Sequence, residues 1–158
     1  MNYLAYQSSD LLNGNGLRST LFVSGCSHGC VGCYNVDSWN PKEGQLFTEE
    51  HENNIIADLN DPKINRQGLS LSGGDPLYKR NRRQILQLVK RVKSECANKD
   101  IWLWTGFTKE ECLADSLMSE IISYVDVLVD GKFEQDKYDP NLKWKGSSNQ
   151  NVIFMSKI

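Results

Sequence analysis

Residues 21–33 read LFVSGCSHGCVGC and hold the clearest signal in this chain. The apolar run at the start predicts a short strand that ends at Gly25 and leads straight into a loop. The loop carries Cys26, Cys30 and Cys33 in the spacing C-x3-C-x2-C, and no fourth cysteine lies nearby. Three thiolates can hold three irons of a 4Fe–4S cluster and leave the fourth iron free for another ligand. Because an open coordination position is typical of a reactive metal site, the spacing predicts a cluster that does chemistry on a bound ligand.

Glycines and a histidine share this loop with the cysteines. Gly25, Gly29 and Gly32 allow the tight backbone that a loop around a cluster needs. A zinc site with His28 as the fourth ligand is the alternative, but a position two residues after Cys26 is cramped for a tetrahedral ligand. A thioredoxin-like pair needs only C-x2-C and leaves Cys26 unexplained. Outside the zinc alternative, His28 is expected to be solvated.

The composition is that of a globular protein. The 158 residues favour a single domain over 1–158, with 39 % hydrophobic and 24 % charged side chains. A formal net charge of −2 gives no sign of nucleic-acid binding. No apolar run approaches the roughly 20 residues that span a bilayer, and the N-terminus lacks the pattern of a secretory signal. We therefore expect a cytoplasmic protein without a membrane segment, in a compartment where thiols stay reduced.

Strand and helix signals alternate along the chain. Helices are expected after Thr48 as N-cap, over 82–97, and after Thr108, where Glu111 completes a capping box. The inner face of that last helix is expected to hold Leu113, Leu117, Ile121 and Ile122. Strands are expected at 21–23, 69–72, 101–104, 124–129 and 152–155. This order predicts an α/β fold of parallel strands with outer helices. A closed eight-strand barrel needs about 250 residues, so the chain can build only an incomplete, open β/α barrel.

Candidate site residues follow the expected strands. In parallel α/β sheets the ligand lies at the carboxyl ends of the strands. Those ends carry Gly25-Cys26, Gly73-Gly74-Asp75, Thr105-Gly106 and Asp130-Gly131. All of the candidate chemistry is therefore expected at one edge of one sheet.

Two of these motifs resemble a known superfamily. The cysteine spacing followed by an aromatic residue, Tyr34, is similar to the signature of the radical S-adenosylmethionine enzymes. The turn Gly73-Gly74-Asp75-Pro76 resembles the Gly-Gly-Glu motif of that family, with Asp75 in place of Glu. The resemblance implies that the open iron binds S-adenosylmethionine and that the reduced cluster cleaves it to a 5′-deoxyadenosyl radical, with the protein placing and shielding this chemistry.

Further segments resemble the glycyl-radical-enzyme activases, and among them the anaerobic ribonucleoside-triphosphate reductase-activating proteins. The similar stretches are 13–18, 33–35, 102–106, 125–131 and 146–150. Pyruvate formate-lyase activases resemble the chain around the cluster but are longer. The resemblance implies that the radical takes a hydrogen atom from a glycine of the anaerobic ribonucleotide reductase, the glycyl radical subunit. Another glycyl radical enzyme or a small molecule as substrate, or a zinc-bound interaction module, are the alternatives.

The resemblance also implies the roles of the site residues, with no catalytic side chain beyond the cluster and cofactor. Cys26, Cys30 and Cys33 would bind the cluster. Residues expected to bind S-adenosylmethionine are Gly32, Cys33, Tyr34, Gly73, Gly74, Asp75 and Asp130. Because the chain has no second cysteine cluster, electrons are expected from an external donor such as a flavodoxin. The basic run 79–83 is either solvated surface or a docking site for an acidic donor.

Overall fold

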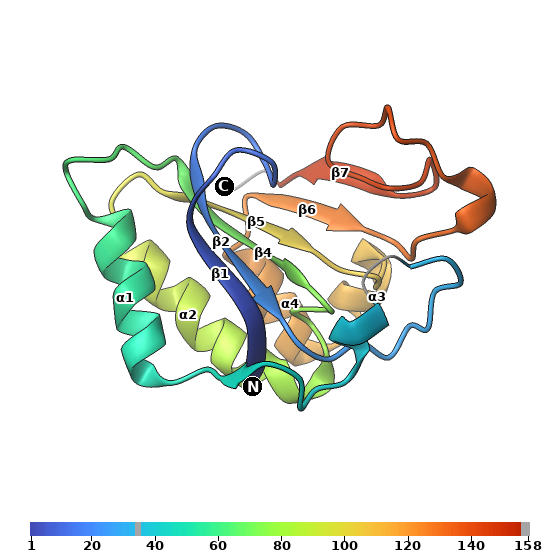
Figure 1. The fold of residues 1–158 in the computed structure, drawn as a ribbon, viewed down its shortest axis with the longest axis horizontal. Coiled ribbons are helices and arrows are strands. Elements are labelled where there is room, and N and C mark those ends of the chain that lie inside the picture. The colour runs from blue at the N-terminus through green and yellow to red at the C-terminus, as the bar shows by residue number, and fades with distance from the viewer. Residues whose placement is uncertain (34–35, 156–158) are drawn as a thin grey trace.

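The computed structural model describes residues 1–33 and 36–155, shown as a ribbon in Figure 1. The strands of this described part form one seven-stranded sheet in the order β3-β1-β2-β4-β5-β6-β7. They are β1 (Asn2–Asp10), β2 (Arg18–Val23), β3 (Gln45–Leu46), β4 (Gly68–Gly73), β5 (Asp100–Trp104), β6 (Val127–Asp130) and β7 (Asn151–Phe154). The helices are α1 (Glu49–Leu59), α2 (Arg82–Glu95), α3 (Lys109–Leu113) and α4 (Ser116–Ser123), with short 3-10 turns η1 (Val36–Trp39), η2 (Lys79–Asn81) and η3 (Gln135–Lys137).

The sheet is parallel at its centre and antiparallel at its edges. Strands β2, β4, β5 and β6 pair in parallel, which confirms the α/β class. The expectation that all strands are parallel is wrong, because β1, β3 and β7 pair antiparallel with their neighbours. Only residues 11–17 join β1 to β2, and a link this short permits a hairpin but not the crossover that a parallel pair requires.

Local capping explains where the helices begin. The Thr48 side chain caps α1, and Thr108 forms a capping box with Glu111 at the start of α3, as the sequence indicated. The single helix expected after Thr108 is in fact two, because the Asp115 carboxylate accepts hydrogen bonds from the first turn of α4 and starts a new helix. Leu113 consequently lies 56 % exposed and not on an inner face. Within residues 1–33 and 36–155, no helix has the length and apolar character needed to cross a membrane.

The two faces of the sheet differ in character. Leu21, Leu71 and Leu103 belong to an apolar core that they share with residues of α1, α2 and α4. These helices lie together on one face of the sheet (Figure 1). Side chains alternate along a strand, so the neighbours of these leucines point to the other face. There lie Arg18 and Trp102, which are buried beneath the β1–β2 loop and the long β6–β7 connection, residues 131–150. A ligand site can therefore form on this face of the sheet, opposite the helices.

Candidate active site

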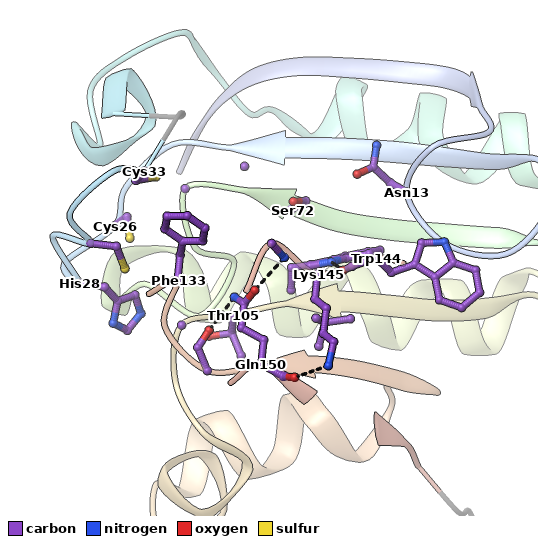
Figure 2. A pocket seen from close by; sticks show the side chains of 18 of the residues that line it. Asn13, Cys26, His28, Cys33, Ser72, Thr105, Phe133, Trp144, Lys145 and Gln150 are labelled. Atoms are coloured by element: carbon purple, nitrogen blue, oxygen red, sulfur yellow. Dashed lines mark hydrogen bonds between the residues drawn. The ribbon is translucent and has the colours of Figure 1, made fainter. Parts of the chain in front are cut away.

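A cavity of about 330 Å³ lies at the carboxyl ends of the parallel strands. Its walls come from the cysteine loop, the ends of β4, β5 and β6, and the 131–150 connection; they include Cys26, Cys30, Cys33, Ser72, Gly73, Gly74, Thr105, Gly106, Val129 and Gly131. Figure 2 shows Cys26, Cys33 and His28 at one end of the cavity and Asn13 and Trp144 at the other. All four strand ends that carry candidate motifs contribute to this cavity, through Cys26, Gly73 and Gly74, Thr105 and Gly106, and Gly131, whereas Gly25, Asp75 and Asp130 are not among its lining residues.

Backbone hydrogen bonds hold the start of the cysteine loop. Gly25 donates its N–H to the Ser38 carbonyl at 2.6 Å, and Cys26 donates to the Trp39 carbonyl at 3.2 Å. Gly25 has a φ of 102°, and an added Cβ there would collide with the Tyr78 ring. Only glycine meets both conditions without strain, because an L side chain disfavours this conformation. The loop therefore leaves β2 in one defined direction, toward the cavity.

The three cysteines offer a donor set that suits an iron–sulfur cluster. All three are free and half-buried, and burial raises the pKa of the Cys26 thiol to about 11. Among the described residues, no three His, Cys, Asp or Glu side chains converge closely enough to hold a single metal ion. A cluster binds each thiolate to a different iron, so its ligands need not meet at one point. Three soft sulfur donors at one end of the cavity are ligands that an iron–sulfur cluster accepts.

The side chain of Asp75 connects the segments that surround this cavity through hydrogen bonds. Its carboxylate is 1 % exposed and lies 2.6 Å from His28 Nε2. Thr105 Oγ1 donates to both carboxylate oxygens, at 2.9 and 3.0 Å, and Gly106 N–H donates at 3.0 Å. Leu77 N–H donates to Oδ1 at 2.8 Å. Direct contact of Asp75 with a cofactor stays a prediction; in the structure its carboxylate joins the cysteine loop, the turn after β4 and the end of β5.

His28 is the site residue that the sequence placed wrongly. Its side chain is only 5 % exposed, and its ring packs edge-to-face on Phe107 with 4.6 Å between ring centroids. The expectation that His28 is solvated is therefore wrong. An added Cβ on Gly106 would collide with the imidazole, so a glycine is needed where β5 ends. No local pattern could reveal the pair of His28 and Asp75, because 47 residues separate them.

The glycine turn after β4 lies against the cysteine loop. Gly74 donates its N–H to the Val23 carbonyl at 2.8 Å, and Asp75 donates to the Gly25 carbonyl at 2.7 Å. A Cβ added to Gly74 would stand 2.5 Å from the Gly25 carbonyl oxygen and 2.7 Å from that of Ser38. Gly73 and Gly74 both line the cavity, which is where the sequence predicted them.

Gly32 and Asp130, two further predicted cofactor residues, are not among the residues that line the cavity. Gly32 stands beside Gln135, whose Cδ would be 2.7 Å from an added Cβ. Tyr34 falls outside the described residues. Asp130 is buried and accepts hydrogen bonds from Lys109 N–H at 2.8 Å and from Asn151 Nδ2 at 3.2 Å. The role of Asp130 toward a cofactor stays a prediction.

The 131–150 connection supplies lining residues that the sequence did not single out. Phe133, Trp144 and Lys145 line the cavity together with Gln150. Gln150 Oε1 accepts from Gly146 N–H at 2.9 Å, and its Nε2 donates to the Gly131 carbonyl at 2.9 Å. These bonds fold the connection back over the sheet. Its sequence has no periodic apolar pattern, so only the similar stretch 146–150 marked it in advance.

Arg18 fixes the opposite wall. Its guanidinium is fully buried, donates to Ser70 Oγ at 2.7 Å and pairs with Asp100 at 2.6 Å. It also lies over the Trp102 ring, 5.4 Å from the centroid. Burial lowers the pKa of Arg18, and the carboxylate of Asp100 opposes that effect. Arg18 Nη1 also donates to the Asn15 carbonyl at 3.1 Å, and Ser70 Oγ donates to the Asn13 carbonyl at 2.6 Å, so the β1–β2 loop, which brings Asn13 to the cavity, is held on the sheet.

Comparison with known proteins places the site in a family. A model described as a 4Fe-4S single cluster domain matches residues 12–153, a range that contains the three cysteines and the cavity. A protein of Pasteurella multocida is 57 % identical over 98 % of this chain and 97 % of its own length. One of Escherichia coli (strain K12) is 54 % identical over 96 % and 97 %, and one of Enterobacteria phage T4 is 46 % identical over 96 % and 93 %. All three are named anaerobic ribonucleoside-triphosphate reductase-activating protein. The chain belongs to this family of activating proteins and, with them, to the proteins that carry a single 4Fe–4S cluster.

Proposed function

We propose that the protein activates an anaerobic ribonucleoside-triphosphate reductase by generating a glycyl radical on it. The observation that carries the proposal is the placement of Cys26, Cys30 and Cys33 at one end of a cavity whose adjacent wall is the turn Gly73-Gly74. When bound, the reduced 4Fe–4S cluster supplies the electron that cleaves S-adenosylmethionine to methionine and a 5′-deoxyadenosyl radical, which takes a hydrogen atom from the target glycine.

The chain itself would bind and orient these groups. Cys26, Cys30 and Cys33 would each hold one iron, and the bare backbone of Gly73 and Gly74 would let the methionine part of the cofactor approach closely. Backbone groups of Gly32, Cys33 and Tyr34 would contact the cofactor from the loop side. Asp75 and Asp130 would support it from the ends of β4 and β6.

The sheet leaves access for a protein substrate. Its terminal strands, β3 and β7, do not pair with each other, so the sheet does not close on itself. We assign it as the incomplete, open β/α barrel of the radical S-adenosylmethionine enzymes, within a single domain. Such a barrel leaves a wide mouth through which a glycine loop of the reductase can reach the cofactor.

Electrons must reach the cluster from another molecule in this account. The five cysteines include one cluster motif, while Cys96 and Cys112 are buried in the apolar core. We therefore propose an external donor such as a flavodoxin, with the whole reaction in the cytoplasm.

The test uses iron-reconstituted protein under anaerobic conditions with dithionite, S-adenosylmethionine and the reductase. We expect 5′-deoxyadenosine and an organic radical on the reductase, measured by chromatography and electron paramagnetic resonance. Cys26→Ala should abolish both. The matched control is Cys112→Ala, because Cys112 is fully buried in α3 and burial raises its pKa to about 12, which marks an inert thiol.

Three results would contradict the proposal. Purified protein with one zinc per chain and no iron would indicate a zinc-bound interaction module. Cofactor cleavage with no radical on the reductase, but with one on another glycyl radical enzyme or with a modified small molecule, would assign a different substrate. Equal loss in Cys26→Ala and Cys112→Ala would show that the cluster ligands are misassigned.

A further inference from the structure

We propose that Lys79, Arg80 and Arg83, together called the cationic turn, dock an acidic protein that delivers single electrons to the cluster. The inference rests on the proposed function, because only a redox-active cluster needs such a donor. In the transfer one electron leaves the donor, which is oxidised, and enters the cluster, which is reduced; no bond forms or breaks.

The cationic turn has charge available for a partner. Lys79, Arg80 and Arg83 are exposed, and none of them forms an ion pair with the part of the chain that the structure describes. Arg82, by contrast, lies 3.4 Å from Asp115 and stacks over the Phe107 ring. The chain as a whole carries a net charge of −2, and these three cations lie within five residues of sequence with no acidic residue between them. Such a surface attracts an acidic one.

The cationic turn is fixed directly behind the cysteine loop. The Tyr78 ring occupies the space beside Gly25, the residue before Cys26. Asn81 Nδ2 donates to the Ser24 carbonyl at 2.9 Å and to the Asp75 carbonyl at 3.1 Å. Tyr78 and Asn81, the residues on either side of Lys79 and Arg80, thus contact residues next to the cysteine loop, so a protein seated on this turn would lie close to that loop. Electron transfer weakens steeply with distance, which favours docking at this point over any surface at the other end of the sheet.

The position also separates the donor from the reductase. Helix α2 begins in the cationic turn and buries Ile85 and Leu88 against the core on the helix-covered face of the sheet. The cavity lies on the opposite face, between β4–β6 and the 131–150 connection. A donor on the cationic turn would leave the cavity mouth open, so both partners could be bound while the cluster is reduced.

A groove extends the surface from Arg83 along α2 and α4. Leu86 and Leu117 are partly buried in it, while Lys90 and Glu120 form an ion pair of 3.3 Å at its side. Apolar groups within a charged rim are the usual composition of a protein–protein contact. The groove therefore gives a docked protein contact area beyond the three cations.

The experiment measures cluster reduction by stopped-flow absorbance, without S-adenosylmethionine or reductase. Reduced flavodoxin serves as the acidic donor and dithionite as the small donor. We expect Arg80→Glu and Arg83→Glu each to slow reduction by flavodoxin about tenfold at low ionic strength, because steering by opposite charges is lost. Reduction by dithionite should stay within about twofold, because a small molecule needs no docking surface. Added salt should slow reduction by flavodoxin more in the parent protein than in the variants, since salt screens the attraction between the two proteins.

Lys63→Glu is the matched control, because Lys63 is exposed, changes charge by the same amount and precedes β4 at the other end of the sheet. The inference would be overturned if Lys63→Glu slowed reduction by flavodoxin as much as Arg80→Glu does. It would also be overturned if neither arginine variant slowed that reduction. In a separate activation assay with S-adenosylmethionine and the reductase, slower radical formation by an arginine variant whose reduction by flavodoxin is normal would assign the surface to the reductase and also overturn the inference. If one arginine variant fails to hold iron, the other decides. Failure of the proposed function would appear separately, as no cofactor cleavage by dithionite-reduced parent protein.

Discussion

His28 Nε2 lies 2.6 Å from Asp75 Oδ2, and this contact joins two segments that are 47 residues apart in the chain. His28 belongs to the loop that holds the three cysteines, and Asp75 to the turn after β4, whose Gly73 and Gly74 line the cavity. Thr105 and Gly106 donate to the same carboxylate from the end of β5. The buried carboxylate of Asp75 thus fixes the cysteine loop, the glycine turn after β4 and the end of β5 relative to one another.

Replacing Asp75 should destabilise the protein. Asp75→Ala leaves the Thr105 hydroxyl and the Leu77 and Gly106 N–H groups buried without their acceptor. Each such group costs about 1–3 kcal/mol, so we expect the three together to lower the free energy of unfolding by about 3 kcal/mol or more, measured with urea. Thr105→Val removes one donor to the carboxylate and the acceptor of the Phe107 N–H, so it should cost less, about 1–2 kcal/mol. Equal losses for the two variants would contradict the central role of the carboxylate.

His28→Gln should weaken the hold on the cluster more than it weakens the fold. Groups that support metal ligands typically contribute about tenfold to a hundredfold in metal affinity, so iron should leave the variant correspondingly faster in the presence of a chelator. Iron release is followed by absorbance. His51→Gln is the control, because His51 belongs to the capping box of α1, away from the cavity. Release at the parental rate from His28→Gln would show that the loop holds its geometry without this contact.

A methyl group at position 74 should disrupt the site. The Cβ of Gly74→Ala would press on two backbone oxygens, those of Gly25 and Ser38, which cannot rotate away. We expect loss of S-adenosylmethionine binding, measured by equilibrium dialysis on the reconstituted protein. Gly29→Asn in the cysteine loop is the control and should leave binding unchanged. No atom lies within 4 Å of an added Cβ at this position, and Asn tolerates the φ of 62°. Unchanged binding in Gly74→Ala would mean that the turn can move aside.

Lowering the pH should remove the contribution of Asp10 to the free energy of unfolding. Burial acts to raise the pKa of this carboxyl, but hydrogen bonds from Asn13, Thr20 and Leu12 N–H outweigh it and lower the pKa below its ordinary value. Its stabilising effect is therefore complete above the unfolded pKa of about 3.9 and is lost as pH falls through the folded value. At pH 7 Asp10→Asn should cost about 1–2 kcal/mol, and the difference from the parent should shrink toward pH 3. A difference that stays constant over this range in urea titrations would refute the assignment.

The sequence predicted the centre of the fold better than its edges. Strands β2, β4 and β5 each carry two aliphatic residues that alternate with other residues, and α2 repeats apolar residues at helical spacing, so the strand period and the helix period could both be recognised. Strand β1 was missed because most of its side chains are exposed or half-buried and show no clear alternation. Strand β3 has two residues and exists only through pairing with β1.

The candidate site, like the fold, was predicted from the sequence only in part. The cysteines and Gly73-Gly74 could be predicted because each motif is contiguous and follows a strand. The contact of His28 with Asp75 and the lining by Trp144 and Lys145 depend on how distant segments fold together. No spacing in the sequence encodes them, and only the three-dimensional arrangement shows that they share one cavity.

The most direct test of the account is electron paramagnetic resonance of the dithionite-reduced, iron-reconstituted protein before and after addition of S-adenosylmethionine. We expect a 4Fe–4S signal whose g values shift when the nucleoside binds the iron that lacks a cysteine. A signal that is identical with and without S-adenosylmethionine would contradict the account, because it would mean that a side chain already occupies that iron.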